Sequence, residues 1–110
     1  MDDRNQITSE QTHLITCIVQ RGKGDAIAQA AIKAGAGGAT THFARGTGTR
    51  ERLGLLGLAI VPEKEVVLVI CKEDESLRIF DAVAKAGKLD VPGMGTAYIT
   101  PIIKVVGGSF

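Results

Sequence analysis

Two short runs of the sequence are apolar at nearly every position, and they constrain the fold more than any other feature. They span residues 14–19 (LITCIV) and 65–71 (EVVLVIC). A strand with one face in water alternates apolar and polar residues, whereas a strand covered on both faces is apolar throughout. Both runs are far too short to cross a bilayer. We therefore expect them to be the central strands of a single sheet.

The sequence patterns that predict the remaining strands are weaker. Residues 39–44 (ATTHFA) carry the threonines and the alternation that are typical of a strand. Residues 96–100 and 102–106 are expected to form a last strand that is interrupted at Pro101. Residues 1–12 are polar and have no period, so they are predicted to be an N-terminal tail, with the domain spanning residues 13–110.

Two helices are predicted between these strands. Asp25 is expected to cap the first helix, which ends at Gly35, and Asp74 to cap the second, which ends at Gly87. Helical spacing places one apolar set of residues on the inner face of each helix. These sets are Ile27, Ala30, Ala31 and Ala34 in the first helix, and Leu77, Phe80, Val83 and Ala84 in the second.

The resulting order is strand, helix, strand, strand, helix, strand. Two right-handed halves of this kind interleave into a ferredoxin-like α+β sandwich, a four-stranded antiparallel sheet with both helices on one face. A chain of 110 residues has no further helix to cover the other face. We therefore expect identical subunits to pack sheet against sheet, as an oligomer.

The segment 46–62 (GTGTRERLGLLGLAIVP) joins the second and third strands and is longer than such a connection requires. Its leucines have to fold back on the domain, cover a ligand or insert into a partner. One interpretation is a loop packed on its own subunit. The other is a partner-docking loop, whose contact residues are Leu53, Leu55, Leu56 and Leu58.

Composition narrows the classes of function. The chain has 13 Lys and Arg against 12 Asp and Glu, with four aromatic residues and no Trp, so nucleic-acid binding is not expected. The first residues have no apolar core of the signal-peptide type, which predicts a cytoplasmic protein. Cys17 and Cys71 lie inside apolar runs and are expected to be buried free thiols.

Glycines and cations gather in two segments and suggest a site for a small anion. Backbone N–H groups and positive side chains are the groups that hold an anion, although the same glycines can simply form turns. The candidate ligand-binding residues are Gly46, Thr47, Gly48, Arg50, Arg52, Gly87, Lys88, Gly93, Gly95 and Thr96.

The segments ITCIV, IKAGAGGATTHFARGTG, AIVPEKEVVLVI and AVAKAGKLDVPGMGTAYITPIIKVVGG together resemble the PII signalling proteins, which are trimeric nitrogen regulators. The resemblance covers roughly residues 13–108 and implies that this chain forms a homotrimer. It implies that residues 46–62 are the T-loop, which docks into transporters and enzymes. It also implies that residues 87–95 are the B-loop, which helps to hold an adenine nucleotide (ADP, AMP or ATP) between subunits.

The chain departs from the PII pattern at three phosphate-binding positions. Thr96 stands where the pattern has a lysine, and Gly107 and Ser109 stand where it has arginines. The loss of fixed cations predicts weaker recognition of a triphosphate. The only tyrosine is Tyr98, outside the segment that matches the T-loop, so uridylylation of that loop is not expected.

No residues are expected to be catalytic. His13 and His42 lie outside any recognised metal-ligand spacing, and no serine, cysteine or lysine has a histidine or carboxylate at an activating distance in sequence. The predicted function is a non-enzymatic regulator of a membrane transporter or a metabolic enzyme. The alternative is an acylphosphatase-like hydrolase that uses the turn at residues 20–24.

Overall fold

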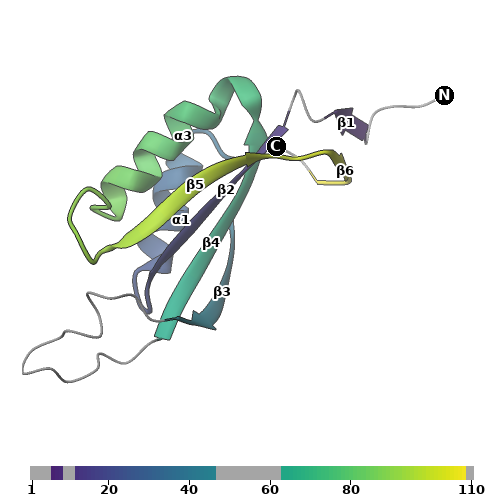
Figure 1. The fold of residues 1–110 in the computed structure, drawn as a ribbon. Coiled ribbons are helices and arrows are strands. Elements are labelled where there is room, and N and C mark those ends of the chain that lie inside the picture. The colour runs from purple at the N-terminus through teal and green to yellow at the C-terminus, as the bar shows by residue number, and fades with distance from the viewer. Residues whose placement is uncertain (1–5, 9–11, 47–62, 109–110) are drawn as a thin grey trace, which may run out of the picture.

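The computed structural model describes residues 6–8, 12–46 and 63–108. The chain order is strand, strand, helix, strand, strand, helix, strand, strand (Figure 1). The elements are β1 (Gln6–Thr8), β2 (Thr12–Gln20), α1 (Gly24–Lys33), β3 (Thr40–Arg45), β4 (Glu63–Lys72), α3 (Glu73–Ala86), β5 (Gly95–Pro101) and β6 (Lys104–Val106).

Four of these strands form one antiparallel sheet in the order β3-β4-β2-β5. The two apolar runs are its central strands, β2 and β4, as the sequence predicts. Both helices lie on the same face of this sheet (Figure 1). The predicted ferredoxin-like sandwich is therefore confirmed.

The core lies between the helices and the sheet. On β2 the alternate residues Ile15, Cys17 and Val19 are buried, each at most 1% exposed. They belong to one cluster with Ile27 of α1 and Ile79 of α3. Each helix thus contributes a stripe of apolar residues to the core, which is the arrangement that an amphipathic helix on a sheet requires.

Two details of the helix predictions are wrong. Leu77 was expected to face inward but is 70% exposed, whereas Ser76 and Ile79 are buried. Asp25 and Asp74 were expected to be N-caps, but each lies in the first turn, where a negative charge favours the positive end of the helix. The predictions failed because each helix begins earlier than its Asp, at Gly24 and Glu73.

The second face of the sheet has no described helix on it (Figure 1). Its side chains come from the other alternate positions of the same strands. Leu14, Ile18, Leu68 and Ile70 on this face are only partly buried, whereas Val66, which pairs with Ile18, is buried. We refer to this surface as the bare face. An apolar sheet face is normally covered by a further layer of helices or strands, and the described part of the chain provides no such layer here.

The end of the chain differs from the expected single interrupted strand. β5 stops at Pro101, and β6 leaves the four-stranded sheet to pair with β1 in a separate two-stranded sheet. Proline lacks the N–H that a ladder needs, which is one reason for the strand to end there. The pairing also places a short strand, Gln6–Thr8, inside the segment that was predicted to be a polar tail.

Both cysteines are free and buried, as predicted. Burial raises the pKa of the Cys17 thiol to about 11, and burial together with the charge of Glu75 raises the pKa of Cys71. The thiolate is the reactive form. We therefore expect neither thiol to react with Ellman's reagent in the folded protein at neutral pH, and both to react after unfolding.

The raised pKa of Cys17 also makes the stability of the fold depend on pH. The folded pKa of Cys17 lies above its ordinary value of 9.0, so the neutral thiol is favoured by the fold. Its contribution to stability is present below pH 9 and is lost as the pH rises toward about 11. Rapid labelling of the folded protein at neutral pH would contradict this account.

Candidate functional site

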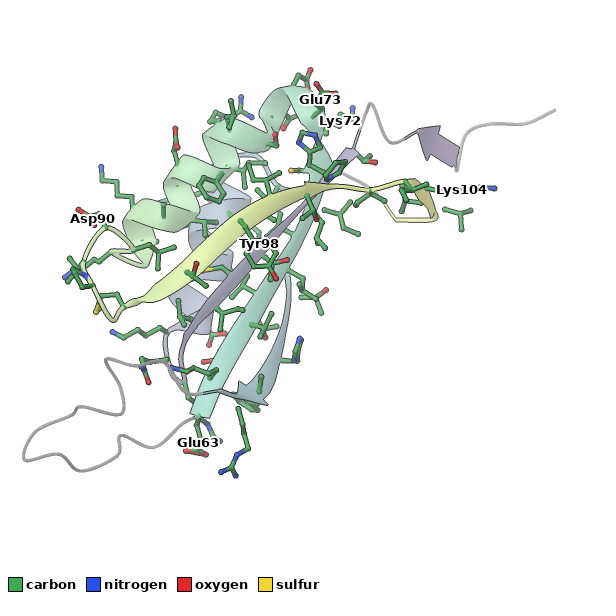
Figure 2. All side chains as sticks on the ribbon, viewed as in Figure 1. Glu63, Lys72, Glu73, Asp90, Tyr98 and Lys104 are labelled. Carbon is green, nitrogen blue, oxygen red and sulfur yellow. The ribbon has the colours of Figure 1, made fainter. Side chains whose placement is uncertain are left out.

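One end of the four-stranded sheet gathers three connections. The register pairs Val19 with Gly95, Gln20 with Lys64 and Arg45 with Glu63. The turn between β2 and α1, the ends of the β3–β4 connection and the segment between α3 and β5 therefore meet at this end. Figure 2 shows Glu63 and Asp90 toward this end, and Lys72 and Glu73 at the other.

The predicted ligand residues belong to two of these connections. Gly46 directly follows β3, and the set from Gly87 to Thr96 runs from the end of α3 into β5. β3 and β5 are the two edges of the sheet, with β4 and β2 between them. Three strand spacings amount to about 14 Å. The structure brings the two groups to the same end of the sheet but to opposite edges of it.

The other predicted residues of residues 46–62 lie outside the described part of the chain. These are the ligand candidates Thr47, Gly48, Arg50 and Arg52 and the docking candidates Leu53, Leu55, Leu56 and Leu58.

Two of the predicted ligand glycines have packing reasons of their own. A Cβ on Gly95, whose φ is +142°, would collide with the backbone oxygen of Ile18 and lie 3.0 Å from Cγ1 of Val19. A Cβ on Gly87 would lie 3.0 Å from Cδ2 of Leu89. The close approach of these segments to the sheet therefore requires glycine whether or not a ligand is bound.

Lys88 is the cation of the α3–β5 segment. It is exposed and adopts a left-handed backbone conformation, with a φ of 52°, directly after the helix ends. Its N–H donates to the Lys85 carbonyl at 3.2 Å, and the Lys88 carbonyl accepts from the Val91 N–H at 3.0 Å. The turn thus fixes the backbone from which this ammonium group extends.

The turn between β2 and α1 is held by a carboxylate from β4. Glu65 is only 8% exposed, and its Oε1 accepts hydrogen bonds from the N–H of Gly22 at 2.6 Å and of Gly24 at 3.2 Å. A Cβ on Gly24 would collide with the same carboxylate. Sequence analysis missed this contact. The available signal was a glutamate at the start of an otherwise apolar strand, next to a glycine-rich turn.

This contact counts against the acylphosphatase-like alternative. A turn that holds a phosphate presents its N–H groups to the ligand. Here two of those groups, on Gly22 and Gly24, already donate to the protein's own Glu65.

Arg21 links this turn to β3 and to the start of β4. Its Nη1 donates to Oε2 of Glu63 at 2.7 Å, and its guanidinium lies 4.4 Å from the centre of the Phe43 ring. These three residues line a small cavity of about 190 Å³ together with Ala44 and Arg45. The ion pair is about half exposed, so its contribution to stability is small.

The two histidines have no catalytic arrangement. Nδ1 of His13 lies 2.9 Å from Oγ of Ser76, but that hydroxyl donates to the Glu73 carbonyl at 2.9 Å, so His13 is the donor in the pair. Ser76 is 1% exposed and out of reach of a substrate. His42 is exposed and lies 3.2 Å from the Phe43 carbonyl. Among the described residues, no group of His, Cys, Asp or Glu side chains is arranged to hold a metal ion.

None of the described helices is long and apolar enough to span a membrane.

Comparison with known proteins identifies one family. The model of the family "Nitrogen regulatory protein P-II" matches residues 12–107. A solved structure with a similar fold is that of Arabidopsis thaliana PII bound to citrate, with a TM-score of 0.65 and 17% identity. The match covers 84% of this chain and 78% of the Arabidopsis chain. No curated protein matches.

Proposed function

Because the chain belongs to the nitrogen regulatory protein P-II family, we propose that it is a non-enzymatic regulator that binds a small anionic metabolite between subunits. An adenine nucleotide is the proposed effector, and a transporter or a metabolic enzyme is the proposed target. The target would be contacted through residues 46–62, as the sequence predicts.

The observation that carries this proposal is the placement of the candidate ligand residues. Gly46 follows the edge strand β3 and Gly95 begins the opposite edge strand β5, so these two lie at the same end of the sheet about 14 Å apart by strand spacing. Lys88 lies in the segment that leads from α3 into β5. A small anion does not reach both edges of one subunit. Two subunits side by side bring the β3 edge of one next to the β5 edge of the other, and this arrangement would give one ligand both sets of contacts.

The bare face supports the same assembly. Leu14, Leu68 and Ile70 remain partly exposed on it, and packing against further copies would bury them. We propose a homotrimer for this reason and because of the family.

The chemistry of the effector follows from the charges present. Lys88 is one exposed cation at the α3–β5 segment, and Thr96 of β5 adds a hydroxyl where a second cation would strengthen phosphate binding. This favours a ligand of lower charge than a triphosphate. The Arabidopsis protein is bound to citrate, so a polycarboxylate belongs in the test beside AMP, ADP and ATP.

Isothermal titration calorimetry with these four compounds tests the proposal. For the compound that binds, Lys88→Ala is expected to weaken binding by about 1.5 to 3 kcal/mol, or roughly 10- to 150-fold, because a hydrogen bond to a charged group is lost. Lys33→Ala is the control, since Lys33 is also exposed but lies in the last turn of α1, away from this end of the sheet. Absence of binding at millimolar concentration, or equal losses in both variants, would refute the assignment of the site.

A further inference from the structure

The separate two-stranded sheet, β1 with β6, is the part of the described chain that the proposed function does not explain. We call it the terminal ribbon, Gln6–Thr8 paired with Lys104–Val106. It projects from the end of the sandwich opposite to Glu63 and Asp90 (Figures 1 and 2). It is therefore spatially separate from the candidate ligand residues.

The ribbon and the connection that leads into it expose apolar side chains to water. Ile103, in the connection from β5 to β6, is 88% exposed, and Val106 is 71% exposed. A two-stranded ribbon is only marginally stable in water unless a further strand or layer packs on it. Exposed apolar residues on such an element are typical of a surface that a partner covers.

The ribbon and the bare face border one hollow. An open cavity of about 690 Å³ extends from the central strands to the end of the ribbon. Leu14, Leu68 and Ile70 line it from the sheet, and Val105 and Val106 line it from the ribbon. The remaining lining comes from small residues of the α1–β3 connection, from Thr40 at the start of β3, and from Gly107 and Gly108. The apolar surface of the ribbon is thus continuous with that of the bare face.

We propose that the terminal ribbon is an intersubunit arm, which packs its apolar side chains against a second copy of this chain. The continuity of the two surfaces supports this occupant, because a neighbour that covers the bare face also reaches the ribbon. Ile103 does not line the cavity, so a small ligand that filled the hollow would leave this side chain in water. In a cyclic assembly each copy extends an arm to one neighbour and receives an arm from the other, so the apolar side chains of every arm are buried.

This inference rests on the self-association proposed above, and it assigns a role to chain segments outside that site. Residues 6–8 hold β6 in the ribbon through the pairing of Ile7 with Val105 and its neighbours. The N-terminal segment therefore acts on assembly by shaping the C-terminal strand.

The test compares two exposed apolar residues. Ile103→Asp places a charge next to the ribbon, in the connection that leads into β6, and Leu77→Asp places the same charge on α3, where the leucine is 70% exposed. Light scattering over a dilution series measures the dissociation of each variant. We expect Leu77→Asp to assemble like the unaltered protein and Ile103→Asp to dissociate at a protomer concentration at least about tenfold higher, since an isoleucine loses its burial.

The outcomes separate the two proposals. A trimer whose dissociation is the same in both variants would overturn the ribbon assignment and leave the proposed function standing. An unaltered protein that is monomeric throughout would overturn both. Hydrogen exchange gives a second readout without substitution, because the amides of Lys104–Val106 are expected to be protected in the assembly and to lose protection on dilution. Protection that does not depend on concentration would also overturn the inference.

Discussion

Replacing Gly95 by alanine is expected to destabilise the protein by about 4 kcal/mol. Two costs add: the new Cβ collides with the Ile18 backbone oxygen, and a φ of +142° is strained for any residue with a side chain. Because the obstacle is backbone of the adjacent central strand, it does not move aside as a side chain would. Urea denaturation at a fixed protomer concentration measures the loss, since the stability of an oligomer depends on concentration.

Gly46→Ala is the matched control. A Cβ on Gly46 meets no heavy atom within 4 Å. We expect a change in the free energy of unfolding below about 1 kcal/mol, the usual range for Gly→Ala at an unstrained position. If both variants unfold at the same urea concentration, the result would contradict the close approach of β5 to β2 at Gly95.

Replacing Glu65 by alanine is expected to cost about 3 kcal/mol. The N–H groups of Gly22 and Gly24 would lose their acceptor, and the N–H of Gly24 is buried, so water does not readily replace the carboxylate. Glu65→Gln keeps an oxygen at the same place and should recover more than half of the loss. Thermal unfolding of the two variants at one pH and one protomer concentration gives the comparison.

Glu63→Ala is the control for charge alone. Glu63 lies two residues away on β4 and pairs with Arg21 at 2.7 Å, but both side chains are about half exposed. The expected cost is at most about 1 kcal/mol. Equal losses for Glu63→Ala and Glu65→Ala would mean that the buried backbone contacts of Glu65 contribute nothing of their own.

The contact of Glu65 also bears on function. It ties the start of β4 to the turn at Gly22 and Gly24, while Arg21 ties the same turn to Glu63 and stacks on Phe43 of β3. The two strands that border residues 46–62 are therefore anchored to the sandwich at their ends. A ligand that affects the proposed docking segment would therefore act on a segment whose two flanking strands are held in place by these contacts.

The element order and the fold followed from the sequence because hydrophobic periodicity is a local property. The uninterrupted apolar runs around Cys17 and Cys71 identified the central strands, and the topology followed from the handedness of the two halves. The inner face of the second helix did not follow from the sequence in the same way. Leu77 satisfies the helical period as well as Ser76 does, and only the position of α3 on the sheet decided that Ser76 is buried beside His13.

The sequence by itself determined the sandwich, the buried thiols and the two glycine-bearing segments, since each depends on residues close together in the chain. Tertiary structure alone decided three things. It placed Gly46 and Gly95 at opposite edges of the sheet, it brought the Glu65 carboxylate to the turn at Gly22, and it paired β1 with β6 across nearly the whole chain. The physical reason is that these contacts join residues far apart in sequence, whose encounter depends on strand register and sheet order.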